Sequence, residues 1–134
     1  MTERARWVRR TSNKRPVTIS GKPASSTDPA TWSTFAEAKA SSAGVGLGFV
    51  LGDGIGCIDL DHCFDGGALA DWAVEYIRTV SEHVIFSEVS QSGDGVHLFI
   101  EAPEGPGRKI RDGRSVERYT AGRYIAVTGN AIKL

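Results

Sequence analysis

The chain of 134 residues is long enough for one compact domain and too short for two, because single domains most often contain about 100–150 residues. With 40% hydrophobic and 24% charged residues, the composition excludes a disordered or fibrous protein. No apolar run approaches the roughly 20 residues of a membrane span, and no secretory signal opens the chain. We therefore expect a cytoplasmic protein without a membrane partner, in which Cys57 and Cys63 are buried thiols.

The zero net charge hides a segregated distribution of charge. Residues 1–23 contain seven Lys and Arg against one acid, residues 24–107 thirteen Asp and Glu against two bases, and residues 108–134 seven bases against two acids. Such a chain can fold into a positive surface around a carboxylate centre, which a metal-dependent site for phosphate compounds requires. Taken alone, the charge asymmetry is more typical of solvated surface charge. The sequence motifs have to distinguish this interpretation from a phosphate-binding site.

The first 43 residues form a predicted N-terminal module with one helix. Residues 11–31 are rich in Ser, Thr, Pro, Lys and Gly without a sustained period, which predicts a loop or short extended segments. Asp28 directly before Pro29 is typical of a helix start. The pattern that follows predicts a helix from Ala30 to about Ala40.

Residues 44–134 form the predicted main sheet. Apolar segments at 44–51 and 55–61, separated by Gly-Asp-Gly, predict a β-hairpin. Apolar residues at spacings of three and four predict an amphipathic helix from Ala68 to about His83. Further strands are expected at 84–89, 96–100, 115–119 and 123–127. This order of elements predicts an α+β domain, with a mostly antiparallel sheet and helices packed on one face.

A paired acid lies in the second strand of the predicted hairpin. Because side chains alternate along a strand, Ile58 and Leu60 point to one face, and Asp59 and Asp61 to the other. Like charges two residues apart are unfavourable unless a cation lies between them, and a hard divalent ion with oxygen ligands is the usual compensation. The alternative is an exposed sheet face with both acids solvated, and the motif alone leaves the two interpretations equally open.

Two further groups follow later in the chain. Ser92, Gly93 and Gly95 lie in a turn where backbone N–H groups and a hydroxyl can converge on an anion, and His97 stands on the strand that follows. This predicts a phosphate-binding loop, although Ser-Gly-Asp-Gly is more often a plain hairpin turn and a lone strand histidine is more often structural. Glu117 lies on a later strand and would supply the third carboxylate of a two-metal site.

In this order the three motifs resemble those of the phage-type primase-polymerases, which belong to the archaeo-eukaryotic primase superfamily. The family's motifs are a paired acid, a Ser-Gly-x-Gly-x-His strand and a late carboxylate. The matching segments here are Ile-Asp59-Leu-Asp61-His-Cys, Ser92-Gly-Asp-Gly-Val-His97 and Val-Glu117-Arg-Tyr. Residues 13–16 and 28–32 also resemble the family's N-terminal module, so the resemblance covers nearly the whole chain. It implies a primase-like catalytic fold with an RRM-like core.

The resemblance also implies a role for each motif residue. Asp59, Asp61 and Glu117 would be catalytic and would hold two Mg²⁺ or Mn²⁺ ions, which activate a 3′-hydroxyl and stabilise the transferred phosphoryl group. Seven residues are expected to bind the nucleotide: Ser92, Gly93, Gly95 and His97 at the triphosphate, Arg123 and Lys14 at further phosphate oxygens, and Tyr124 at the sugar.

The implied function is that of a DNA primase-polymerase, a nucleotidyltransferase that adds a (d)NTP to a 3′-hydroxyl on a single-stranded or primed DNA template in phage or plasmid replication. One alternative is a non-catalytic accessory module that binds nucleotide or single-stranded DNA, for which Trp7 among basic residues offers a stacking surface. Another is a metal-dependent nuclease that uses the same carboxylates. Family members usually continue into a helical region and often a helicase, so we expect these 134 residues to be a single catalytic domain of a longer protein.

Overall fold

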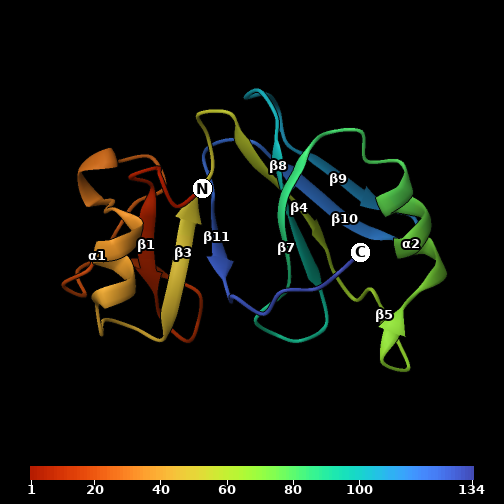
Figure 1. The fold of residues 1–134 in the computed structure, drawn as a ribbon, viewed down its shortest axis with the longest axis horizontal. Coiled ribbons are helices and arrows are strands. Elements are labelled where there is room, and N and C mark those ends of the chain that lie inside the picture. The colour runs from red at the N-terminus through yellow and green to blue at the C-terminus, as the bar shows by residue number, and fades with distance from the viewer.

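The computed structural model describes residues 1–134 as two antiparallel sheets lying side by side, with one α-helix at each end of the molecule (Figure 1). The four-stranded sheet has the order β11-β3-β1-β2. Its strands are β1 (Trp7–Arg10), β2 (Pro16–Val17), β3 (Gly46–Val50) and β11 (Tyr124–Val127). All pairings in this sheet are antiparallel.

The second sheet has five strands in the order β7-β8-β4-β10-β9, again all antiparallel. Its strands are β4 (Ile55–Leu60), β7 (Val84–Val89), β8 (Val96–Glu101), β9 (Arg108–Arg111) and β10 (Ser115–Tyr119). The predicted α+β class with mostly antiparallel pairing is therefore confirmed. The expectation of one sheet with both helices on one face is wrong, because the strands divide between two sheets that each pack against a different helix.

The predicted hairpin of residues 44–61 does not form. The turn is at the predicted place, since Gly52 and Ile55 exchange two backbone hydrogen bonds of 2.9 and 3.1 Å, but β3 then belongs to one sheet and β4 to the other. Both edges of β3 are paired, with β1 and β11, and both edges of β4 are paired, with β8 and β10. Neither strand has a free edge for the other, and the chain crosses between the sheets here and again from β10 to β11.

The N-terminal segment contributes a central strand that the charge-rich sequence did not predict. Trp7 and Val8 of β1 are 2% and 1% exposed, and Trp7 pairs with Phe49 of β3. Residues 11–31 form the expected irregular segment, with only the two-residue β2 and one 3-10 turn. The strand forms despite its arginines because Trp7 and Val8 are both buried, Trp7 in the core between the two sheets.

The helix predicted from Ala30 to Ala40 is divided into two. A 3-10 turn (Pro29–Thr31) begins at Asp28, whose side chain accepts a hydrogen bond from the Ala30 N–H, as predicted. Ser33 then exchanges two backbone hydrogen bonds with Trp7, which holds the chain extended. The helix α1 (Phe35–Ala40) starts only after this bridge, with Thr34 and Glu37 forming a capping box.

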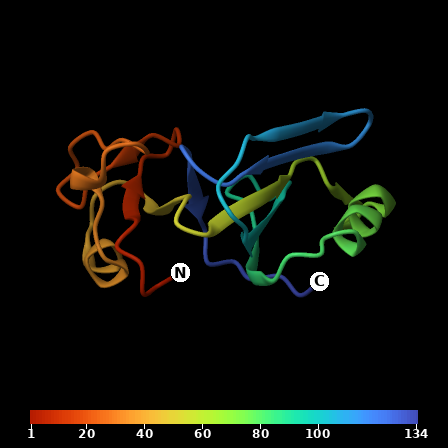
Figure 2. The same cartoon turned by 90° about the horizontal axis from the view of Figure 1, so that it is seen from above.

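The second helix, α2 (Asp71–Arg78), is also shorter than predicted. Residues at its expected start are instead in a small ribbon of β5 (Phe64–Asp65) and β6 (Ala68–Leu69). The apolar face of α2 covers the outer face of the five-stranded sheet (Figure 2). The buried residues of this first core are Ile58, Leu60, Cys63, Ala73, Val96, Leu98, Ile100, Ala102 and Val116.

A second core lies between the two sheets. Its buried residues are Trp7, Ala38, Phe49, Leu51, Ile55, Cys57, Phe99 and Tyr119. The rings of Phe49 and Phe99, one from each sheet, meet edge to face with their centroids 6.4 Å apart. Cys57 and Cys63 are both free and buried, as predicted. Neither helix has the length and apolar character needed to cross a membrane.

Candidate active site

The inner face of the five-stranded sheet carries one apolar row and, beside it, one polar row. Directly paired residues on neighbouring strands point to the same face, and the next row lies two residues further along each strand. The apolar row packs under the four-stranded sheet and comprises Phe86, Phe99, Cys57 and Tyr119. The polar row lies beyond the edge of this contact and comprises Glu88, His97, Asp59, Glu117 and Lys109.

The polar row brings together residues from all three predicted motifs. Asp59 on β4 lies between His97 on β8 and Glu117 on β10, as their direct cross-strand partner. The Nε2 atom of His97 is 3.9 Å from Oδ1 of Asp59. No hydrogen bond to the Asp59 carboxylate is present, although its side chain is only 31% exposed. Asp59 is thus a half-buried acid without a bonding partner at the centre of the row.

The pKa of Asp59 is shifted by its surroundings. Burial raises the pKa of Asp59 above its ordinary value of 3.8, and the negative charges of Asp61 and Glu117 raise it further. Interactions with His97 and Lys14 lower the pKa of Asp59 but do not cancel the effect. A carboxyl group surrounded by other carboxylates in a half-buried position favours either a proton or a cation.

This pKa shift predicts how stability changes with pH when divalent ions are absent. Because the folded-state pKa of Asp59 lies above 3.8, ionising Asp59 costs stability, and the loss appears as the pH rises through that folded-state value. We expect Asp59→Asn to remove this loss, so that the chelator-treated variant unfolds at higher denaturant concentration than wild type at neutral pH. Urea titrations of both proteins from pH 3 to 8 measure the difference, and equal midpoints at neutral pH would contradict it.

Asp59 and Glu117 share a face, and Asp61 follows the end of β4, but the oxygens of the three predicted metal ligands are not gathered around one point. Glu117 accepts a hydrogen bond of 2.8 Å from Nη2 of Arg111 and has Nζ of Lys109 at 3.8 Å. The one group of acidic and histidine side chains with ligand atoms within 4.8 Å of one another is Asp61, His62 and Asp94. The charge of Glu117 is thus balanced by its basic neighbours Lys109 and Arg111.

A polar cavity of about 210 Å³ opens beside Asp59 and His97 of the row. Its walls come from both sheets, and the lining residues are Lys14, Asp59, Gln91, His97, Tyr124, Ile125 and Ala126. Four predicted site residues, distant in sequence, therefore line one cavity: Lys14, Asp59, His97 and Tyr124. The Tyr124 hydroxyl donates to the backbone oxygen of Lys14, and Gly48 makes room for the ring, since a Cβ there would lie 2.6 Å from Tyr124.

Within the turn at residues 90–95, the N–H groups of Gly93, Asp94 and Gly95 are bonded to the turn itself. The Gly93 N–H donates to the Ser90 oxygen at 3.0 Å, the Asp94 N–H to the Ser92 hydroxyl at 3.2 Å, and the Gly95 N–H to the Ser90 hydroxyl at 3.0 Å. Gly95 also allows close packing, because a Cβ there would lie 2.7 Å from the Leu60 oxygen. Phosphate binding by Ser92, Gly93 and Gly95 stays a prediction that requires this turn to exchange its internal bonds.

Two other basic or aromatic candidates lie elsewhere. The Arg123 guanidinium does not line the polar cavity and stacks over the ring of Tyr119, 4.2 Å from its centroid. The idea that Trp7 offers a stacking surface for bases is wrong. Its ring is 2% exposed and packs edge to face against Phe35 and Phe49, so no base can reach it.

Sequence reasoning missed three polar residues near the site. Glu88, fully buried on β7, binds His97, and Gln91 accepts from Nε of Arg10 at 2.9 Å and donates to the Ser12 oxygen at 3.2 Å. His62 contacts Asp94. A glutamate within the apolar pattern Val-Ile-Phe-Ser-Glu-Val was a signal that could have identified Glu88, because a charge in a buried strand requires a partner.

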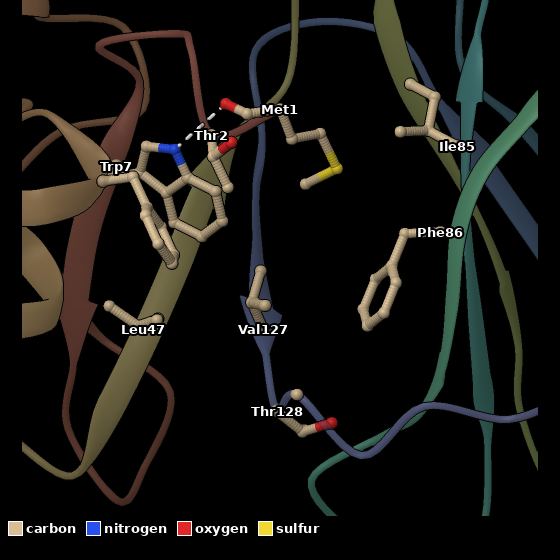
Figure 3. A pocket seen from close by; sticks show the side chains of 10 residues that line it. Met1, Thr2, Trp7, Leu47, Ile85, Phe86, Val127 and Thr128 are labelled. Carbon is tan, nitrogen blue, oxygen red and sulfur yellow. Dashed lines mark hydrogen bonds between the residues drawn. The ribbon is translucent and has the colours of Figure 1, made fainter.

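A larger apolar cavity of about 370 Å³ lies between the sheets and is shown in Figure 3. Leu47 and Val127 line it on one side, and Ile85 and Phe86 on the other. None of its lining side chains is acidic, basic or a histidine. It therefore offers nothing for a metal ion or a phosphate, and the polar cavity remains the candidate active site.

Comparison with known proteins identifies the family of the chain. Residues 7–133 match the model of the family described as bifunctional DNA primase/polymerase, N-terminal. The chain belongs to this family. The matched range includes both sheets and every residue of the polar row.

One relative is the DNA primase-polymerase of Nitratiruptor phage NrS-1, which is 36% identical over 135 aligned positions. The alignment covers 92% of this chain but 18% of the relative. These 134 residues therefore correspond to a small part of that longer protein. The resemblance expected from the three motifs is confirmed at the level of the family.

Proposed function

We propose that this domain catalyses template-directed transfer of a (d)NTP to a 3′-hydroxyl, with two divalent metal ions at the polar row. The observation that carries this proposal is the register of β8, β4 and β10, which aligns His97, Asp59 and Glu117 on one face beside a polar cavity. The family to which the chain belongs supports the same reaction class. We place the reaction in the cytoplasm of a bacterial or phage-infected cell.

The three predicted metal ligands fit a hard divalent cation. Asp59, Asp61 and Glu117 offer only oxygen donors, which Mg²⁺ and Mn²⁺ prefer. Asp59 is partly buried and accepts no hydrogen bond, so its lone pairs are free for an ion. Bound ions would supply Lewis-acid chemistry, lowering the pKa of a 3′-hydroxyl and offsetting the charge of the phosphoryl group and the departing pyrophosphate.

The polar cavity is suited to the incoming nucleotide. Lys14 brings a positive charge and His97 a ring nitrogen to the same space, while Tyr124 offers an aromatic face at its opposite wall. We assign the triphosphate to the His97 side and the sugar to the Tyr124 side. Arg123 and the turn of Ser92, Gly93 and Gly95 lie outside the cavity and would contact phosphate only after rearrangement.

The arm formed by β9 and β10 is suited to the DNA backbone. This hairpin extends beyond the rest of the sheet (Figure 2). Lys109 and Arg111 lie on the same face as Glu117, where they are about half exposed and pair with it. A metal ion that takes Glu117 as a ligand would release both cations for phosphate groups next to the reacting 3′-end.

Arg111→Ala tests this assignment through DNA binding. Wild type is expected to bind single-stranded DNA weakly in chelator and more tightly with Mg²⁺, because the ion neutralises the carboxylates and frees Arg111. The variant should lose part of the metal-dependent gain and about 0.7 of the slope of log affinity against log salt, the value for one phosphate contact. Fluorescence anisotropy with a labelled oligonucleotide measures both.

The control is Arg78→Ala, which removes an exposed arginine from α2, where it pairs only with Glu75. Arg78→Ala is expected to leave affinity and salt slope unchanged. Equal slopes for wild type and Arg111→Ala would show that the hairpin does not contact the backbone. Binding that ignores salt and metal would favour the non-catalytic accessory module.

The direct test of the proposed function is incubation with labelled nucleotide, Mg²⁺ or Mn²⁺, and either primed or unprimed single-stranded template. Extension of a primer or synthesis of a new strand supports it. Cleavage of the DNA without incorporation would identify a metal-dependent nuclease instead. Because the chain spans 18% of the phage relative, the assay should be repeated with a helicase or helical domain of a longer parent protein as possible partner.

A further inference from the structure

Glu88 is a charged side chain in a position where charge is costly. It is 0% exposed, and it lies on β7 as the direct neighbour of His97 on β8. Its carboxylate accepts hydrogen bonds from Nδ1 of His97 at 2.9 Å, from the Thr128 N–H at 3.0 Å and from the Gly129 N–H at 3.1 Å. A buried carboxylate persists only when its oxygens are bonded in this way.

The Glu88 carboxylate connects the two sheets, but other hydrogen bonds also connect them at this place. The Thr128 hydroxyl donates to the Val89 oxygen at 2.6 Å, and the Val89 N–H donates to the Asn130 oxygen at 2.8 Å. These bonds hold residues 128–130 along β7 without Glu88. The contact that no other residue in the structure replaces is the bond to the His97 ring.

That bond decides which ring nitrogen faces the cavity. A carboxylate can only accept, so Nδ1 of His97 must carry the proton toward Glu88 in either charge state of the ring. Nε2 is then directed to the other side, where it lies 3.9 Å from Asp59. A hydrogen-bonded acid behind a functional histidine fixes both its tautomer and its ring orientation.

We propose that Glu88 is a positioning residue, which holds His97 so that Nε2 faces the triphosphate of the bound nucleotide. The same carboxylate binds the backbone directly after β11, the strand that begins with Tyr124. The bonds to the Thr128 and Gly129 N–H groups hold the Glu88 carboxylate in place behind the His97 ring. The role at the nucleotide rests on the proposed function, whereas the orientation of the ring does not.

Glu88→Gln makes a specific change in the ring. The amide is best satisfied when its oxygen accepts from the Thr128 and Gly129 N–H groups and its NH₂ donates to Nδ1 of His97. This arrangement requires the His97 proton on Nε2. ¹⁵N spectra of histidine-labelled protein are therefore expected to show Nδ1–H for His97 in wild type and Nε2–H in the variant, with the signal assigned by loss in His97→Ala.

Nucleotide affinity is the second readout. Calorimetry with a non-hydrolysable nucleotide and Mg²⁺ is expected to show about tenfold weaker binding for Glu88→Gln. Mutating the hydrogen-bond partner of a ligating histidine typically reduces affinity or activity by ten- to a hundredfold. In the His97→Ala background the same substitution should have no further effect, since Glu88 acts through the ring. The control is Thr128→Val, which removes the hydroxyl bonded to the Val89 oxygen and the Asn130 N–H but keeps the backbone N–H that binds Glu88, and it should keep the wild-type His97 signal.

Several outcomes would overturn the proposal. They are an Nε2–H signal in wild type, an unchanged His97 signal in Glu88→Gln, or a tenfold loss that persists in the His97→Ala background. The wild-type spectrum decides the matter even if Glu88→Gln does not fold. If wild type itself binds no nucleotide, the proposed function fails, while the comparison of spectra still tests whether Glu88 orients His97.

Discussion

Asp59→Asn is expected to abolish nucleotide incorporation while leaving the fold intact. Asp59 is the centre of the polar row, with the predicted ligand Glu117 on one side and His97 on the other. The amide keeps the size of the side chain but lacks the negative charge that binds a divalent ion. Metal ions contribute several kcal/mol of transition-state stabilisation, and each 1.36 kcal/mol corresponds to tenfold in rate, so we expect a loss of at least about 10³-fold.

The measurement is primer extension with labelled nucleotide, accompanied by circular dichroism to show that the variant is folded. Asp65→Asn is the matched control, because Asp65 is an exposed acid on the β5–β6 ribbon, outside the polar row. It should retain wild-type incorporation. Near wild-type activity of Asp59→Asn with full dependence on metal would mean that the metal ions bind elsewhere, for example at the group of Asp61, His62 and Asp94.

Trp7→Ala is expected to cost stability, with no direct loss of DNA contacts. The ring is 2% exposed, meets Phe35 and Phe49 at centroid distances of 4.9 and 5.1 Å, and donates from Nε1 to the Met1 oxygen at 3.2 Å. Truncating a buried tryptophan to alanine typically costs about 3–5 kcal/mol. Because a domain of this kind is stable by only about 5–15 kcal/mol, the variant should lose a large share of its stability.

Urea unfolding compares Trp7→Ala with Trp32→Ala. Trp32 is half-buried, with Arg6 over its ring at 4.5 Å, and its loss should cost less, about 1–2 kcal/mol. Trp7→Phe keeps most of the apolar bulk and is expected to leave affinity for single-stranded DNA unchanged. A clear loss of DNA affinity in folded Trp7→Phe would restore the stacking role that the buried ring argues against.

Local patterns in the sequence were sufficient for much of the fold. The α+β class, the strands at 84–89 and 96–101, and the cap at Asp28 follow from periodicity and turn residues, which act over a few neighbours. The two free, buried cysteines were predicted from the absence of a secretory signal. The predicted helix ends were less accurate. The hydrogen bonds between Ser33 and Trp7 delay the start of the first helix, and the β5–β6 ribbon takes up the expected start of the second.

The motifs identified residue types, but only the tertiary structure determined their relations. Alternation along β4 placed Asp59 and Asp61 on one face, yet nothing local showed that Glu117 and His97 would be direct neighbours of Asp59 in the sheet. Strand order and register depend on which edges are free after all strands have packed, and this is a property of the whole chain.

The chain's own sequence thus determined the family, through three motifs in a fixed order, and the chemistry of their side chains. Only the tertiary structure showed that the two halves of the predicted hairpin belong to two different sheets. The polar cavity lies between these sheets, with Lys14 and Tyr124 on one side and the polar row on the other. The tertiary structure also decided that Trp7 is buried and that Glu88 faces His97. The physical reason is that burial and pairing depend on contacts between segments far apart in sequence, which residue patterns over a few neighbours do not specify.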